Sequence, residues 1–149
     1  MTTLKVGRPI PEFSSQLHDG SQITSMDLSK GKVILFFYPQ DNTPTCTEEA
    51  CNLRDHHADF IQQGFRVYGV SPDSIRKHQN FIKKYKLPYS LISDPSLDVI
   101  KKFGVWGPKK LFGREYDGVL RTTFLLNNGI VQKVIDEVKA KSHAEQILE

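Results

Sequence analysis

Residues 32–51, KVILFFYPQDNTPTCTEEAC, contain the pattern on which the fold prediction depends. Lys32–Tyr38 is an unbroken β-branched and aromatic run, as expected for a strand covered on both faces, and Pro39 ends it. After Pro44, residues recur at helical spacing until Gly64 ends the pattern, and these residues are Ala50, Leu53, His57, Phe60 and Ile61. The stretch therefore predicts a central strand, a turn and a helix.

The flanking sequence alternates between strand and helix patterns. Phe13–Leu17 and Gln22–Thr24 enclose an Asp-Gly pair, which predicts an N-terminal β-hairpin. The other expected elements are a strand over Phe65–Val70, a helix over Ser74–Tyr85, a strand over Tyr89–Ile92, a helix over Ser96–Phe103, a hairpin of Arg121–Leu126 with Ile130–Ile135, and a closing helix over Lys141–Leu148. This order predicts an α/β protein with a thioredoxin-like fold, in which helices flank a central mixed β-sheet.

Length and composition limit the classes of protein to consider. The chain has 149 residues, no repeat and no long linker, so we expect a single domain over residues 1–149. Its 38% hydrophobic and 10% aromatic content is unlike that of disordered chains, and a net charge of +3 does not indicate nucleic acid. The longest strongly apolar run, Val33–Tyr38, is too short to cross a membrane, and the polar residues Met1–Lys5 lack the apolar region expected of a signal peptide. We expect a cytoplasmic protein with neither membrane nor nucleic-acid partners.

Cys46 is the candidate nucleophile. Two helix starts are possible, one with Thr43 as the cap and Pro44 in the first helical position, the other with Thr45 and Glu48 as a capping box. Both place Cys46 in the first turn, where free backbone N–H groups and the helix dipole favour thiolate over thiol. The structural alternative is a small buried hydrophobic residue.

Cys51, the second of only two cysteines, lies five positions later. In an intact helix it would be about 140° round the axis and about 7.5 Å along it from Cys46. Because bridged cysteines need Cα atoms within about 7 Å, a bond between the two would require the first turns of the helix to unwind. The alternative for Cys51 is a core position, although Ala50 and Leu53 already supply an apolar stripe.

Other site types fit the sequence less well. Cys46, Cys51 and either His56 or His57 match no common zinc pattern, so we expect no metal. The Cys-x-x-Cys motif of thiol–disulfide oxidoreductases is missing, and Gly69–Asp73 lacks the last glycine of the hydrolase Gly-x-Ser-x-Gly motif. Aromatic and basic residues interleave in a stretch that we interpret as a partly packed loop rather than a nucleic-acid surface: Phe103, Trp106, Lys109, Lys110, Phe112, Arg114 and Tyr116.

The sequence resembles the peroxiredoxins. Pro39, Thr43 and Cys46 match their Pro-x-x-x-Thr-x-x-Cys signature, and the Cys-x-x-x-x-Cys pair followed by Leu53-Arg54-Asp55 is similar to the atypical two-cysteine, bacterioferritin-comigratory-protein (Q-type) branch. Similarity to this branch extends from about Gly7 to the C-terminus and includes the segments Gly104–Gly107 and Arg121–Leu125.

The resemblance implies a thiol-dependent peroxidase that reduces hydrogen peroxide and organic hydroperoxides without cofactor. Cys46 would be the nucleophile, Thr43 and the Cys46 N–H would position the peroxide, and Pro39 would shield the sulfur from water. Arg121 would stabilise the thiolate and bind a peroxide oxygen. The Cys46 sulfenic acid would condense with Cys51 to an intramolecular disulfide, which a thioredoxin-type dithiol would reduce.

We also expect a monomer or a weak homodimer. The sequence departs from the branch in two places. Thr45 stands where glycine is common, so a Cβ is expected to crowd the loop before the sulfur. His56 and His57 follow the Arg-Asp pair, where we expect no particular histidines.

Overall fold

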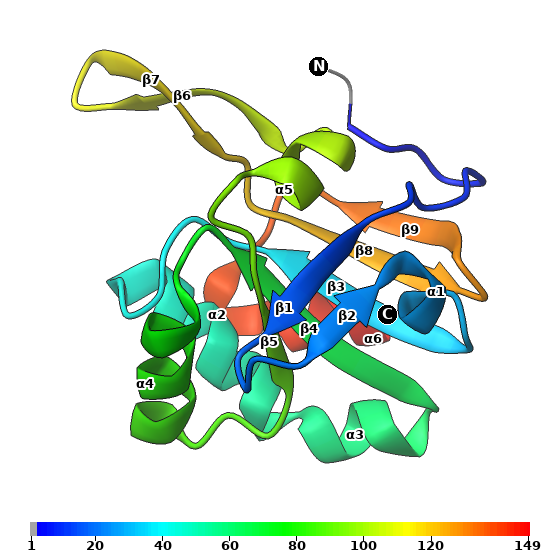
Figure 1. Cartoon of the computed structure of the whole chain (residues 1–149). Coiled ribbons are helices and arrows are strands. Elements are labelled where there is room, and N and C mark those ends of the chain that lie inside the picture. Colours follow the sequence, from blue (N-terminus) through cyan, green and yellow to red (C-terminus); the bar gives the residue numbers. More distant parts are fainter. Residues whose placement is uncertain (1–2) are drawn as a thin grey trace.

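Seven strands form one mixed β-sheet in the order β2-β1-β5-β4-β3-β8-β9 in this computed structural model, which describes residues 3–149 apart from the side chain of Leu111 (Figure 1). The strands of this sheet are β1 (Ser14–Leu17), β2 (Gln22–Thr24), β3 (Lys32–Phe37), β4 (Phe65–Ser71), β5 (Ser90–Ser93), β8 (Thr122–Asn127) and β9 (Ile130–Ile135). The helices are α1 (Ser25–Leu28), α2 (Pro44–Asp55), α3 (His57–Gln62), α4 (Ile75–Tyr85), α5 (Asp98–Lys102) and α6 (His143–Leu148), the last preceded by the 3₁₀ turn η1 (Ala140–Ser142). The predicted α/β class and mixed sheet are confirmed.

Strand β3 is an interior strand of this sheet. It pairs in parallel with β4 and antiparallel with β8, so the first half of the chain and its C-terminal hairpin meet along it. Its side chains alternate between two hydrophobic clusters. Val33, Leu35 and Phe37 face the cluster that includes residues of α1 and α5, whereas Ile34 and Phe36 face the one covered by α2, α3, α4 and α6. The prediction that this strand is covered on both faces is therefore confirmed.

The helical pattern after Pro44 forms two helices rather than one. Helix α2 ends at Asp55. His56, with φ −109° and ψ 11°, interrupts the helical conformation before α3 begins. The break changes the helical register, so that Phe60 is fully buried whereas Ile61 is 53% exposed. The apolar pattern predicted from the sequence therefore marks the buried face at Phe60 but not at Ile61. Gly64 follows α3 with φ +86° as a helix-ending glycine, as expected.

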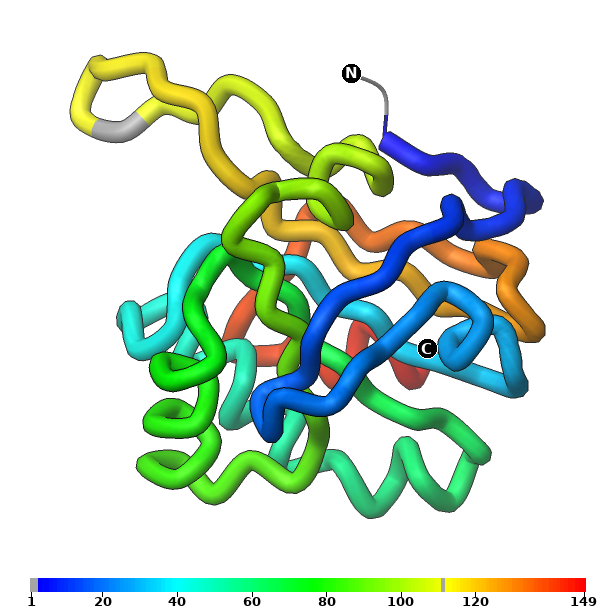
Figure 2. Tube along the Cα trace, viewed as in Figure 1, coloured from blue at the N-terminus to red at the C-terminus, as the bar shows by residue number. Residues whose placement is uncertain are grey.

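A two-stranded hairpin, β6 (Trp106–Leu111) with β7 (Arg114–Val119), lies outside the main sheet and projects from the body of the protein (Figure 2). Its turn residues Phe112 and Gly113 both have positive φ, 51° and 77°, which a two-residue hairpin turn of type I′ requires. Because Phe112 is 96% exposed, the interpretation of this stretch as a partly packed loop is wrong at its tip.

The remaining predicted elements are present with boundaries shifted by a few residues. Strand β8 begins at Thr122, so Arg121 stands immediately before the strand and not on it. Helix α1 was not expected. Within residues 3–149, no helix is long and apolar enough to cross a membrane.

Candidate active site

The β3–α2 connection places Cys46. Thr43, in extended conformation, is the N-cap of α2, and Pro44 takes the first helical position. Of the two predicted helix starts, the first is therefore the one found, and Cys46 lies in the first turn as expected. The Thr43 side chain does not cap the helix, since its hydroxyl donates to the Gln40 carbonyl oxygen at 3.1 Å. Thr45 lies inside the first turn with an exposed side chain.

The Cys46 sulfur is buried against a guanidinium. Cys46 is 2% exposed, and Arg121, which is far away in sequence, donates from Nη2 to its Sγ at 3.1 Å. Burial alone would lower the pKa of Arg121, but the neighbouring Glu49 and Cys46 outweigh this effect and raise it. Arg121 is therefore a fixed positive charge at the sulfur, as its predicted role requires.

Glu49 is a member of this group that the sequence reasoning missed. Its Oε1 accepts from Arg121 Nη1 at 2.6 Å, and its side chain has no exposed surface. Burial raises the pKa of Glu49 to about 7, while Arg121 acts in the opposite direction. Glu49 follows Cys46 by three residues on α2 and so shares its face, a spacing that could have indicated it.

Lys109 brings a second cation to the same region from the middle of strand β6. Its Nζ donates to the Val119 carbonyl oxygen at 2.9 Å. Burial and then Arg121 lower the pKa of Lys109, while Cys46 raises it. A depression of about 510 Å³ on this side is lined by Arg121 and Lys109 among others, and the Cys46 sulfur does not line it.

Pro39 and Thr43, the two predicted site residues of the connecting loop, are both partly buried. The loop between them is fixed to α4. Asn42, with the unusual φ of +63°, accepts at Oδ1 from Tyr85 Oη at 3.1 Å and Lys84 Nζ at 3.3 Å. The structure thus brings Cys46 and Arg121 into direct contact and holds the other two residues on an anchored loop.

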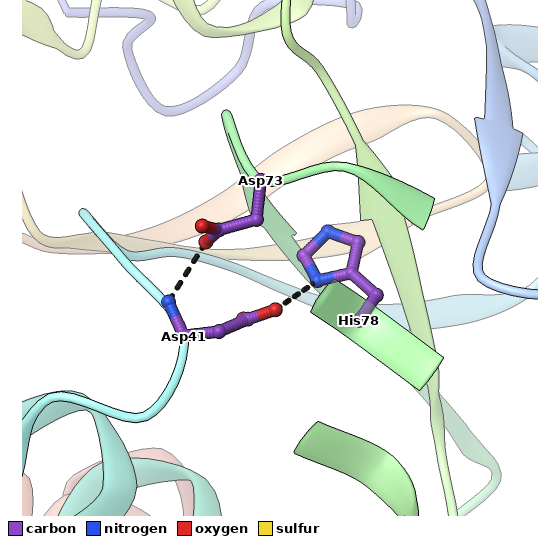
Figure 3. Close-up of side chains that lie close together, drawn as sticks. All are labelled: Asp41, Asp73 and His78. Atoms are coloured by element: carbon purple, nitrogen blue, oxygen red, sulfur yellow. Dashed lines mark hydrogen bonds and ion pairs between the residues drawn. The ribbon is translucent and has the colours of Figure 1, made fainter. Parts of the chain in front are cut away.

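Asp41, Asp73 and His78 form a second buried polar cluster, next to this loop (Figure 3). Asp41 faces His78 Nδ1 at 2.7 Å, and its backbone N–H donates to Asp73 at 2.7 Å. The other ring nitrogen of His78 lies 3.0 Å from the Ile92 carbonyl oxygen, and the Tyr38 hydroxyl donates to Asp41 at 2.6 Å. Hydrogen bonds within the protein therefore account for the cluster without an ion.

The metal site considered from the sequence is not assembled. Among the residues that the structure describes, the potential ligands that converge are those of the Asp41 cluster and include neither cysteine. His56 Nδ1 is 2.9 Å from the Asn52 carbonyl oxygen, within its own helical turn.

Cys51 differs from Cys46 in environment although both lie on α2. Both thiols are free in this structure, and Cys51 is partly exposed where Cys46 is buried. Burial and Asp55 raise the pKa of Cys51, and Arg54 lowers it. The helix from Pro44 to Asp55 is intact, so the two cysteines are separated by five helical positions, as the sequence predicted.

Comparison with known proteins supports one family throughout. The AhpC/TSA family matches residues 6–134. Peroxiredoxin Bcp of Escherichia coli K12 is 38% identical over 149 residues, covering 99% of this chain and 96% of that protein.

Two solved structures extend the similarity to the fold. Bacterioferritin comigratory protein of Xanthomonas campestris has a TM-score of 0.85 at 31% identity and covers 91% of this chain and 87% of its own. Peroxidoxin BcpB of Mycobacterium tuberculosis has a TM-score of 0.84 at 35% identity, and the match covers 97% of this chain and 94% of that chain. These likenesses confirm the thioredoxin-like fold. The chain belongs to the AhpC/TSA family, as a peroxiredoxin of the Bcp branch.

Proposed function

We propose that Cys46 is the peroxidatic nucleophile of this peroxidase. Its thiolate attacks one oxygen of a hydroperoxide, so that an S–O bond forms as the O–O bond breaks. The sulfur loses two electrons and becomes a sulfenic acid, while the departing alkoxide or hydroxide takes a proton. The observation that carries this proposal is the 3.1 Å contact between Arg121 Nη2 and the Cys46 sulfur, because one guanidinium there stabilises both the thiolate and the charge that develops on oxygen.

Thr43 and Pro39 complete the proposed site. The Thr43 hydroxyl, bonded to Gln40 in the ligand-free protein, turns to the peroxide when substrate binds. The first-turn N–H of Cys46 supplies a second donor, and Pro39 limits the access of water to the sulfur. The substrates in this proposal are hydrogen peroxide and organic hydroperoxides, in line with the alkyl peroxide reduction of the X. campestris relative.

Cys51 is the proposed resolving cysteine. It attacks the Cys46 sulfenic acid, water leaves, and an intramolecular disulfide forms. Because α2 holds the two residues apart, its first turns must unwind. This unwinding also breaks the 2.7 Å hydrogen bond that the Tyr89 hydroxyl donates to the Ala50 carbonyl oxygen. A thioredoxin-type dithiol returns both thiols by exchange.

The wider setting is also part of the proposal. The main sheet joins residues from Ser14 to Ile135, which supports a single domain over the whole chain. We expect a monomer or a weak homodimer that works in the cytoplasm without cofactor. Size-exclusion chromatography with light scattering on the reduced protein tests the oligomeric state.

The test of function is peroxide-dependent oxidation of a thioredoxin system by the purified protein. Turnover is expected with the wild type and is lost on Cys46→Ser. A sulfenic-acid reagent should label Cys46 in Cys51→Ser after one equivalent of peroxide, since the resolving thiol is absent. Labelling elsewhere, or turnover without Cys46, would contradict the assignment.

A further inference from the structure

Within residues 3–149, Glu49 Oε2 is the one buried side-chain oxygen or nitrogen without a hydrogen-bond partner. The other carboxylate oxygen accepts from Arg121, and the whole side chain is inaccessible to solvent. An ionised oxygen buried without a donor is strongly unfavourable. Oε2 therefore favours a bound proton, or a donor close enough to supply one.

His143 is the group that faces this oxygen. It comes from α6, is fully buried, and its Nε2 lies 3.6 Å from Glu49 Oε2. This distance is too long for a hydrogen bond, yet the two atoms are neighbours with no solvent access. Whether His143 Nε2 carries a proton therefore decides whether Glu49 Oε2 faces a hydrogen-bond donor or an acceptor.

Gln146 determines which ring nitrogen of neutral His143 carries its hydrogen, and that nitrogen is Nδ1. The Gln146 amide donates from Nε2 to the Glu137 carbonyl oxygen at 2.9 Å, and its Oε1 accepts from the Lys139 N–H at 2.9 Å. The amide orientation is thereby set, and the same Oε1 lies 2.8 Å from His143 Nδ1. Because Oε1 can only accept, Nδ1 must carry a hydrogen.

The second ring nitrogen is then free to accept. Thr123 Oγ1 lies 2.7 Å from His143 Nε2 and donates to it when the ring is neutral. Burial lowers the pKa of His143, Arg121 lowers it further, and the bond to Gln146 opposes them, so the neutral ring is favoured. One proton can then reside between the two residues, on Glu49 Oε2 or on His143 Nε2.

We propose that Glu49 and His143 are positioning residues that share this one proton and thereby set how much of the Arg121 charge is available to the Cys46 sulfur. With the proton on Glu49 Oε2, the carboxyl group is neutral and Arg121 has the thiolate as its only anionic partner. When the proton leaves Glu49, for His143 Nε2 or for solvent, the carboxylate competes for the guanidinium. The inference rests on the proposed function in one respect, that Cys46 is the nucleophile.

Several other charged or titratable groups lie near Glu49 and His143. Burial raises the pKa of Glu49 to about 7, which places its titration in the neutral range. The remaining charged or titratable groups that face the pair and its partners are Cys46 on α2, Tyr89 beside β5, Lys109 on β6, Arg121 before β8 and Lys133 on β9.

Alkylation of Cys46 by iodoacetamide as a function of pH tests the proposal in the full chain carrying Cys51→Ser. Glu49→Gln keeps the position neutral at all pH values. His143→Gln presents an amide N–H to Glu49 and favours its ionised form. We expect the lower alkylation midpoint for Glu49→Gln, the higher for His143→Gln, a separation of about one pH unit, and the unsubstituted parent between them or equal to one of them.

Asn52→Ala is the matched control. Asn52 ties α2 to the C-terminal segment through Lys141 and Ala144, at 3.1 Å and 2.7 Å, and it cannot titrate. If the variants acted only by loosening α6, Asn52→Ala would reproduce the shift of His143→Gln. That result, a reversed order, or equal midpoints for the two variants would overturn the proposal.

A measurement on the wild type does not depend on how well the variants fold. Nitrogen-15 NMR of labelled histidines should find His143 with its proton on Nδ1 and none on Nε2 above neutral pH. A proton on Nε2 alone would overturn the proposal. Peroxide turnover is measured separately, so absence of turnover with separated midpoints would refute the proposed function and leave the pair intact.

Discussion

Two buried polar clusters lie close to the start of α2, and they differ in how completely their atoms are paired. In the cluster of Asp41, Asp73 and His78, buried carboxylate and ring atoms all have hydrogen-bond partners. In the cluster of Glu49, Arg121 and His143, one carboxylate oxygen has none. Complete pairing fixes the loop that carries Thr43, whereas an unpaired oxygen leaves a group that can change its charge beside Cys46.

The largest expected effect concerns the sulfur itself. Cys46→Ser should lower peroxide reduction by about 10⁴-fold or more, because a serine hydroxyl is not ionised at neutral pH and attacks poorly. Stopped-flow fluorescence with hydrogen peroxide measures the rate. Cys51→Ser should keep the first oxidation and lose only the later disulfide, so an equal loss of the first step in both variants would contradict their separate roles.

Replacing the cation of the incompletely paired cluster should have the next largest effect. Arg121→Met should slow the reaction with peroxide about 10²-fold to 10³-fold and move Cys46 alkylation to higher pH, since the thiolate loses its guanidinium donor. Asp73→Asn, in the fully paired cluster, should leave the alkylation midpoint where it is. A shift of equal size in both variants would remove the distinction between the clusters.

The stability of the protein should depend on pH through Glu49. Its pKa is raised from 4.5 to about 7 by burial, so the folded protein favours the protonated acid. This contribution is complete below about pH 4.5 and is lost as the pH rises through about 7, a change of about 3 kcal/mol. Urea unfolding of the reduced protein near pH 5 and near pH 8 measures it.

Glu49→Gln has no such titration. Its free energy of unfolding should therefore rise relative to the wild type by about 2–3 kcal/mol between the two pH values. A constant difference across this range would mean that Glu49 is already ionised in the folded protein at acid pH. Glu49 would then hold no proton to share with His143, contrary to the proposal.

The smallest effect is local. Formation of the Cys46–Cys51 disulfide should increase hydrogen exchange over residues 45–53, because several helical hydrogen bonds of about 0.5–1.5 kcal/mol each are lost there. Hydrogen exchange with mass spectrometry compares the two redox forms, with Val33–Tyr38 as the rigid internal control. Equally slow exchange in a form proven by mass to contain the disulfide would show that no unwinding is needed.

Local sequence signals predicted much of the fold and the nucleophile. Val33–Tyr38 is apolar at every position, as in a strand that is covered on both faces, and Pro44 favours the start of a helix. The positions of β3 and Cys46 therefore followed from nearby residues. Arg121 was identified from the family motif, because nothing in its neighbourhood distinguishes it from a surface arginine.

Glu49 and His143 could not be found in this way. Their burial and mutual approach depend on α6 packing against α2, which is a tertiary contact between distant parts of the chain. The hairpin β6–β7 was missed for a different reason. Its turn is Phe112-Gly113 rather than a common Asn-Gly or Asp-Gly pair, and its strands are mostly polar and exposed, so no buried face produces alternation.

The order of the elements along the chain has a consequence for biosynthesis. Cys46 lies in the first third of the sequence, whereas Arg121 and His143 lie in its last quarter. Arg121 reaches the sulfur only after β8 has paired with β3, and His143 reaches Glu49 only after α6 has packed on α2. During translation the cysteine therefore emerges well before its cation. The nascent thiol therefore lacks its guanidinium donor until the C-terminal strands are in place, and we expect its reaction with peroxide to arise only in chains that have finished folding.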